Sequence, residues 1–199
     1  MEDMTLFLED ANRLATEIHE GNRTAGWWSN KDTGECMLTT RNRPEIMMLV
    51  VSEVAEAAEG YELELKDDKL PEREMAEVEL ADTAIRLYDL IGAEGIVFTN
   101  QPDFVSDEEN YPWFANTIEG FDSALMYIVR AVAHAMEGHR KANRAKYENW
   151  LQVALFRTYW VAGIFCFDID SAITEKRAFN VVRPDHKLEN RLAEGGKAY

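Results

Sequence analysis

Cysteine and long hydrophobic runs are both scarce in this sequence of 199 residues. It has two cysteines, Cys36 and Cys166, which form neither a CxxC pair nor a spacing typical of metal ligands. We therefore expect no disulfide framework and a reducing, cytoplasmic compartment. Cys166 lies in the apolar run 161–167, which predicts a core position for its side chain.

The chain also has no segment that resembles a membrane span. Its most apolar stretch, residues 151–167, is interrupted by Gln152, Arg157 and Thr158. It is too short to cross a bilayer and predicts a buried helix. The first ten residues are acidic and lack a basic flank, which argues against a signal peptide.

Positive charge is outnumbered, with 21 Lys and Arg against 37 Asp and Glu and a formal net charge of −16. A strongly acidic protein repels polyanions, so nucleic acid and anionic membrane surfaces are poor partners. A small phosphate ligand remains compatible, because a bound metal ion inverts the local field. Solubility alone explains most of the charge.

Alternation typical of β-strands is absent over any useful length, which predicts an all-α protein. The length and the 46% hydrophobic content fit one domain over residues 1–199, with a polar tail at 181–199. We expect a four-to-five-helix bundle with helices over residues 4–20, 44–65, 74–91, 118–137 and 142–180, the last broken near Gly163 or Asp168. The phrases SEVAEAAEGYE and VAHAMEGHRK look alike, which is a weak hint of a duplicated helix pair.

Two acidic pairs stand out among the predicted helices. Glu53 and Glu56 are three residues apart, and so are Glu79 and Asp82. That spacing puts each pair on one helix face. Glu53 falls at the edge of an apolar stripe, so it is expected to be partly buried, where an unpaired charge is unfavourable. Arg86 shares the face of the second pair and is expected to partner Asp82 or Asp89.

Four carboxylates on two facing helices repel one another unless protons or a cation intervene. Mg²⁺ prefers such oxygen ligands, and Mn²⁺ is the expected substitute. The alternative is two solvated acidic helix faces, which the spacing alone does not exclude. A di-iron bundle is disfavoured, because none of the four histidines has a glutamate three residues before it.

The flanking sequence adds a resemblance. The ExxE and ExxD pairs are separated by residues 57–78, and they lie within SEVAEAAEGYE, DDKLPER and EVELADTAIRLYDL. With GWW at residues 26–28 and the tail EKRAFNVVRPDHKLENRLAEGGKAY, this resembles the MazG-like all-α NTP pyrophosphohydrolase superfamily, which includes the dimeric dUTPases and dCTPases. The resemblance covers residues 26–89 and 175–199, whereas residues 92–149 match only as generic helix.

The resemblance implies a helical bundle that forms a homodimer or homotetramer, with a site that can draw on two subunits. It implies magnesium-dependent cleavage of a nucleoside triphosphate to the monophosphate and pyrophosphate. Glu53, Glu56, Glu79 and Asp82 correspond to the metal ligands, and Glu53 or Glu56 would activate water. Many members carry a glutamate just before the first motif glutamate, where this chain has Ser52.

Candidate substrate residues lie on either side of the acidic pairs. Lys176, Asn180 and Arg183 share one face if their helix continues, and Lys and Arg suit phosphate. A solvated helix end is the alternative. Trp27 or Trp28 is expected to stack on a base, although either could instead anchor its loop. Four tail residues would close over the ligand or lie on the surface: His186, Lys187, Asn190 and Lys197.

Trp150 and Trp160 are expected in the core or in a subunit interface. The alternative function, from a different class, is a non-catalytic acidic helical module that binds nucleotide or protein. The intact acidic pairs favour the enzyme, whereas Ser52 favours the binding module.

Overall fold

The computed structural model describes residues 2–100 and 116–183, with side chains from residue 7 onward. Its helices are α1 (Glu2–Thr24), α2 (Arg43–Glu62), α3 (Met75–Ala93), α4 (Ile118–Arg140), α5 (Arg144–Ile164) and α6 (Ile169–Val182). The predicted all-α class is confirmed. The predicted helix over residues 142–180 is broken at residues 165–168, between the two positions expected.

Polar residues begin four of these helices. Asn42 and Asn143 each accept a hydrogen bond from the backbone N–H three residues ahead, at 3.3 and 3.0 Å. Thr117 and Asp168 make the same contact at the starts of α4 and α6. These caps satisfy backbone donors that have no partner inside the helix, so the sequence could indicate where the helices begin.

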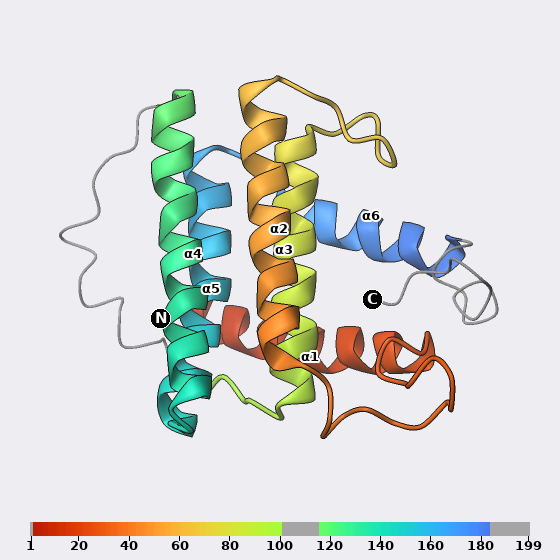
Figure 1. Cartoon of the computed structure of the whole chain (residues 1–199). Helices are drawn as coiled ribbons and strands as arrows, with labels where there is room; N and C mark the ends of the chain where they lie inside the picture. Colours follow the sequence, from red (N-terminus) through yellow and green to blue (C-terminus); the bar gives the residue numbers. More distant parts are fainter. Residues whose placement is uncertain (1, 101–115, 184–199) are drawn as a thin grey trace.

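Helices α2 to α5 form a bundle of two hairpins, α2–α3 and α4–α5 (Figure 1). Helix α2 packs against α4, and α3 packs against α5. Helices α1 and α6 run across the bundle and both contact α3, which is therefore covered on several sides (Figure 1). The site described below lies on the side of α3 where α6 joins it.

Two expectations about the α5 region are resolved by this arrangement. Cys166 is exposed, so its predicted core position is wrong. Helix α5 ends at Ile164, and Cys166 lies in the turn beyond it, with φ of 60°. None of the described helices is by itself long and apolar enough to cross a membrane, and α5 and α6 reach that length only as a pair bent by 114°.

Candidate functional site

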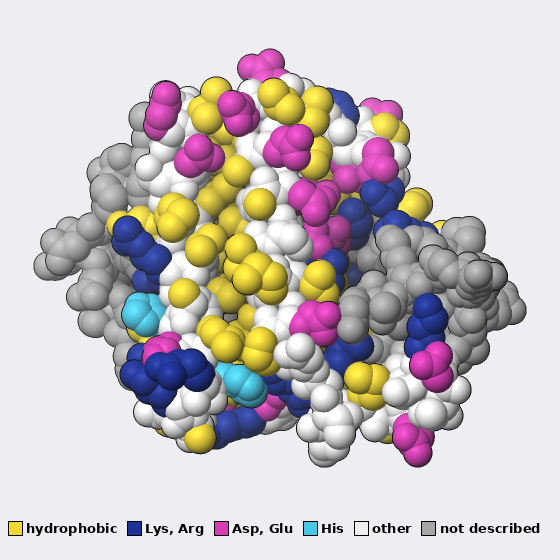
Figure 2. Space-filling view, viewed as in Figure 1, with side chains coloured by type: hydrophobic (Ala, Val, Ile, Leu, Met, Phe, Trp, Pro, Cys, Tyr) yellow, Lys and Arg dark blue, Asp and Glu magenta, His cyan; other side chains and the backbone are white. Residues whose placement is uncertain are grey.

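The two acidic pairs meet where α2 packs against α3. Glu53, Glu56 and Glu79 each place one carboxylate oxygen within 4.8 Å of the other two. Glu53 and Glu79 are each 6% exposed, whereas Glu56 opens to solvent. Acidic side chains gather on this side of the bundle, where α3 and α6 meet, with Lys and Arg next to them (Figure 2). The expected burial of Glu53 is confirmed.

This group of three carboxylates, called here the carboxylate group, has an excess of negative charge. Burial, and then the charges of Asp82 and Glu53, raise the pKa of Glu79 to about 9. Burial and the Glu53 charge also raise the pKa of Glu56. With a pKa of about 9, Glu79 retains its proton at neutral pH unless a cation balances the group.

Arg86 supplies one positive charge to this group. Its Nε donates to Glu53 Oε1 at 2.5 Å, across the interface between α2 and α3. The expected pairing of Arg86 with Asp82 or Asp89 is therefore replaced by a pairing with the neighbouring helix. A single guanidinium leaves most of the charge of three carboxylates uncompensated.

Asp82 lies beside the carboxylate group but takes a different partner. Lys176 on α6 places its Nζ 2.8 Å from Asp82 Oδ2 and 3.9 Å from Asp67 Oδ2. The lysine is only 2% exposed. Burial lowers the pKa of its ammonium, but the attraction of Asp82, Asp67 and Glu79 together outweighs burial and the net pKa is raised. Two residues predicted to bind metal and phosphate thus form an ion pair with each other.

Asp67 is a site residue that the sequence analysis missed. It is 2% exposed, and its Oδ1 accepts the backbone N–H groups of Lys69 (3.0 Å) and Leu70 (2.6 Å). The side chain thereby fixes the turn after α2 and holds a second carboxylate oxygen near Lys176. The phrase DDKLPER drew attention to this turn, but only the packing of α6 shows what Asp67 faces.

A pocket of about 160 Å³ opens next to the Asp82–Lys176 ion pair. Among the described residues, all five predicted to bind substrate contribute to its wall, as does one predicted metal ligand: Trp27, Trp28, Lys176, Asn180 and Arg183, with Asp82. Asn180 Oδ1 is buried and has no hydrogen-bond partner among the residues that the structure describes. Segments more than 140 residues apart in sequence therefore converge on one cavity, as expected if they share a ligand.

The pocket wall also includes residues that the sequence analysis did not assign to the site. These are Asn22, Arg41, Ile46, Leu49, Ile85, Arg86 and Asp89. Arg41 and Arg86 add positive charge, and the aliphatic side chains add an apolar surface. Arg41 lies outside every phrase singled out in the sequence, so no pattern could have predicted its role, whereas Arg86 lies within such a phrase and was expected only to pair with an acid of its own helix.

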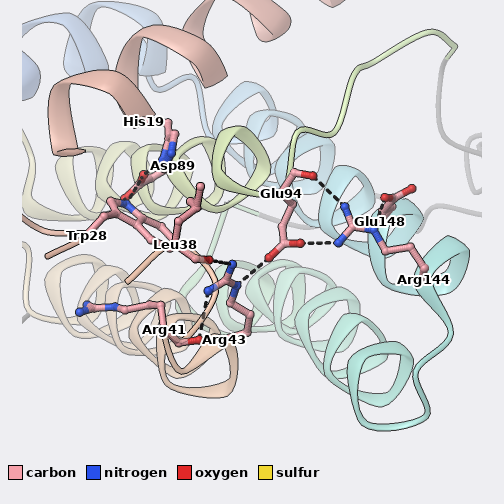
Figure 3. Close-up of polar contacts among 9 residues, drawn as sticks. All are labelled: His19, Trp28, Leu38, Arg41, Arg43, Asp89, Glu94, Arg144 and Glu148. Atoms are coloured by element: carbon pink, nitrogen blue, oxygen red, sulfur yellow. Dashed lines mark hydrogen bonds and ion pairs between the residues drawn. The ribbon is translucent and has the colours of Figure 1, made fainter. Parts of the chain in front are cut away.

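Trp28 anchors its loop rather than offering a free ring. It is 2% exposed, and its Nε1 donates to both carboxylate oxygens of Asp89, at 2.9 and 3.1 Å. His19 on α1 also contacts that carboxylate, at 2.8 Å (Figure 3). Asn22 on the same helix donates to it at 2.8 Å. Asp89 therefore ties α1 and the tryptophan loop to α3. Trp27, half-buried in the pocket wall, is left as the candidate for base stacking.

A second network holds the other end of the same loop. Arg43 donates through Nε to Glu94 at 2.6 Å and through its Nη atoms to the carbonyls of Arg41 and Leu38. Arg144 on α5 pairs with the same Glu94 (Figure 3). Unlike the carboxylate group, Glu94 is matched by two guanidiniums, which lower its pKa despite burial. The charge of Glu94 at this end of the loop is thus balanced by arginine side chains, and no metal ion is needed.

The remaining expectations have mixed outcomes. Ser52 donates its hydroxyl to the Leu49 carbonyl at 2.8 Å, so it supplies no charge. Trp150 and Trp160 are half-buried on α5; Trp150 stacks on His134, and Trp160 lies edge-on to Tyr127. The tail residues His186, Lys187, Asn190 and Lys197 lie outside the described residues.

Comparison of the chain with protein-family models, curated proteins and solved structures finds no match.

Proposed function

We propose that this protein is a magnesium-dependent nucleoside triphosphate pyrophosphohydrolase that releases a nucleoside monophosphate and pyrophosphate. One observation supports this above all others. An undercompensated carboxylate group lies beside a pocket whose wall combines lysine, arginine, asparagine and tryptophan side chains. Acidic groups for a metal and basic groups for phosphate are the two elements that phosphoryl transfer needs side by side.

The donor set fits a hard divalent cation. All three members of the carboxylate group offer oxygen, which Mg²⁺ and Mn²⁺ both prefer. Glu53, Glu56 and Glu79 would hold the ion, with Asp82 as the fourth carboxylate that the sequence resemblance implies. A bound ion would offset negative charge on the phosphates and on the carboxylates alike.

The side chains around the pocket have distinct proposed roles. Lys176, held by Asp82, presents an ammonium to the phosphate chain, and Arg183 can bind phosphate oxygens in a bidentate manner. Asn180 offers an amide to the sugar or phosphate, and Trp27 offers a face for the base. The interior of this pocket thereby carries positive charge within a protein of net charge −16.

Glu56 is the proposed residue that orients and deprotonates the attacking water. Glu53 already forms an ion pair with Arg86, whereas Glu56 faces solvent and has no such partner within the described part of the chain. The raised pKa of Glu56 makes it a better base than an ordinary carboxylate. This choice narrows the two candidates that the sequence left open.

A non-catalytic nucleotide-binding module is the second candidate. Two ion pairs favour it, because Arg86 already occupies Glu53 and Lys176 already occupies Asp82. In that case the basic side chains would compensate the acids permanently, and no cation would be required. The pocket would then bind a nucleotide without cleaving it.

The deciding assay incubates the protein with each NTP and dNTP plus Mg²⁺ and measures pyrophosphate. Wild type should release it from at least one nucleotide, and Glu56→Gln should not. Glu62→Gln, which alters an exposed acid at the end of the same helix, is the matched control and should retain activity. If no nucleotide yields pyrophosphate and wild type equals Glu56→Gln, the enzyme proposal is wrong. Nucleotide binding without release would then support the binding module.

The phosphate-binding role is tested separately with Arg183→Ala. Loss of a charge-assisted contact should weaken nucleotide affinity by about tenfold. Mn²⁺ binding should be unchanged, because Arg183 does not belong to the carboxylate group. Calorimetry with both ligands measures the two effects. An unchanged nucleotide affinity would remove Arg183 from the proposed site.

A further inference from the structure

The hairpin α4–α5 repeats the burial pattern of α2–α3. Gly60 and Gly138 are 78 residues apart, and the same shift carries the last residue of α2, Glu62, onto the last residue of α4, Arg140. All seven buried positions of α2 recur as buried positions in α4 at this spacing. The shared phrases of the sequence, SEVAEAAEGYE and VAHAMEGHRK, lie in register at the same shift.

The turns after α2 and α4 share their backbone geometry. Glu64 and Ala142, again 78 residues apart, both have φ of 51°. The backbone N–H groups of Leu65 and Asn143 close the two turns onto the carbonyls of Gly60 and Gly138, each at 2.9 Å. Corresponding backbone bonds at corresponding positions show that the resemblance extends beyond the hydrophobic pattern.

The two glycines also have the same packing role. A Cβ on Gly60 would lie 2.8 Å from the Met75 side chain, and one on Gly138 would lie 2.6 Å from the Tyr147 backbone nitrogen. Met75 and Tyr147 lie in the first turn of the returning helix in each hairpin. Each glycine therefore allows its two helices to approach closely just before the turn.

Helices α3 and α5 correspond at a spacing of 71 residues. Their last residues, Ala93 and Ile164, are separated by that number. The following left-handed residues, Gly95 (φ 65°) and Cys166 (φ 60°), are separated by it too. The shorter spacing reflects a shorter connection in the second hairpin. The repeat also explains why Cys166 faces solvent, since it occupies the position of a turn glycine.

The two hairpins face each other as related copies. Helix α2 packs against α4 and α3 against α5, so each helix contacts its own counterpart. The counterparts run in opposite directions along the bundle (Figure 1). An approximate two-fold axis across the bundle produces both features, as in a symmetric dimer of hairpins.

The acidic positions are the part that is not repeated. At the positions equivalent to Glu53, Glu56, Glu79 and Asp82, the second hairpin has Ala131, His134, Trp150 and Val153. His134 stacks on Trp150, with ring centroids 4.3 Å apart. Arg157, the equivalent of Arg86, lies 5.6 Å from the Trp150 ring and donates to the Tyr127 carbonyl. Ring packing thus replaces the carboxylate group.

We propose that α4–α5 is a second copy of the α2–α3 hairpin that has lost its cation site and fills, within the chain, the place of a second subunit's hairpin. The chain then carries one cation site, and that site is complete in a single copy. The apolar face of α2–α3 is already covered by α4–α5, so a second subunit is not needed to bury it. This replaces the expectation of a site shared between two subunits.

A subunit-complementation experiment tests whether the site is complete in a single chain. This part of the inference rests on the proposed function, because the readout is pyrophosphate release. Glu56→Gln and Arg183→Ala chains are mixed, exchanged under mild denaturant and assayed for pyrophosphate release. We expect no activity above that of the separate variants, because no intact site can be assembled from two defective chains. Recovery toward the wild-type level would overturn the proposal. A dimer in sedimentation that shows no complementation supports it, because the contact would not involve the site.

Mn²⁺ titration followed by electron paramagnetic resonance tests the loss of the second site without any activity. Wild type should bind at a single location per chain, Glu79→Gln should bind at least tenfold more weakly, and His134→Gln should bind as wild type. A second equivalent location, or weaker binding in His134→Gln, would contradict the proposal. A single Mn²⁺ location per chain in a protein that cleaves no nucleotide would contradict only the proposed function.

Discussion

The hairpins α2–α3 and α4–α5 bury equivalent positions but treat charge in opposite ways. The first places Glu53 and Glu79 at nearly inaccessible positions and offers one guanidinium in return. The second has alanine and tryptophan there, and its acids, such as Glu137, pair with basic residues at the surface. The helical frame tolerates both solutions, so burial of the carboxylates is not needed for folding. It is the kind of local disadvantage that a functional site retains.

Glu79→Gln should have the largest effect, because it removes a member of the carboxylate group. Pyrophosphate release should fall by at least about 100-fold, as expected when a metal ligand is lost. The metal-free protein should unfold at a higher temperature, since glutamine removes the free-energy cost of burying, and therefore protonating, the Glu79 carboxyl. Kinetic assays and thermal unfolding measure the two changes. Full activity in Glu79→Gln would show that Glu79 is not a required metal ligand, and the proposed difference between the two hairpins would be wrong.

The matched glycines come next. Gly138→Ala should destabilise the fold by about 2–3 kcal/mol, because the new Cβ meets rigid backbone of α5. Gly60→Ala should destabilise the fold by a similar amount, about 2–3 kcal/mol, because the new Cβ meets Met75 Cβ at 2.8 Å and the Ala76 backbone nitrogen at 3.0 Å, which the α3 backbone holds in place.

Gly163→Ala is the control for both, because no atom of the described chain outside its own helix turn lies within 4 Å of its Cβ position. This substitution should stabilise α5 by up to about 1 kcal/mol through helix propensity. Chemical denaturation gives all three values. Equal changes in the free energy of unfolding at positions 60, 138 and 163 would show that close approach of the helices does not explain the geometry that the two turns share.

The pH dependence of stability should differ between wild type and Glu79→Gln. The pKa of Glu79 is about 9 when folded and 4.5 in the reference state, so between these values the folded protein holds the extra proton. Stability of the metal-free protein should therefore fall as pH rises through this window, by about 2–3 kcal/mol between pH 6 and pH 8.

Mn²⁺ affinity should increase over the same range, because the ion displaces that proton. Denaturation curves and Mn²⁺ titrations at several pH values measure both trends. Glu79→Gln should flatten the stability trend. A wild-type stability that is constant or rises with pH would show that Glu79 is ionised without a cation.

The smallest effects are expected at the two left-handed turn residues. Glu64→Gly and Ala142→Gly remove the strain of a side chain at φ of 51°. Each should stabilise the fold by about 0.5–1 kcal/mol, because glycine adopts this conformation freely. The two values should agree within about 0.5 kcal/mol if the turns are equivalent, and denaturant midpoints would reveal a difference.

The sequence by itself determined the helical class, the starts of most helices and the residues that could form a site. Periodicity and capping act over a few residues, so the two acidic pairs and the Lys176, Asn180 and Arg183 face could be identified without a structure. The break after Gly163 followed from the same local rules. Each of these features depends on neighbours within one or two helical turns.

Only the tertiary structure decided which of these residues meet. The pairing of Lys176 with Asp82, of Arg86 with Glu53 and of Trp28 with Asp89 depends on how helices distant in sequence pack. An ion pair or an indole hydrogen bond forms only within a few ångströms, and no local pattern encodes that distance. For the same reason the repeated hairpin remained a weak hint until burial and backbone geometry aligned position by position.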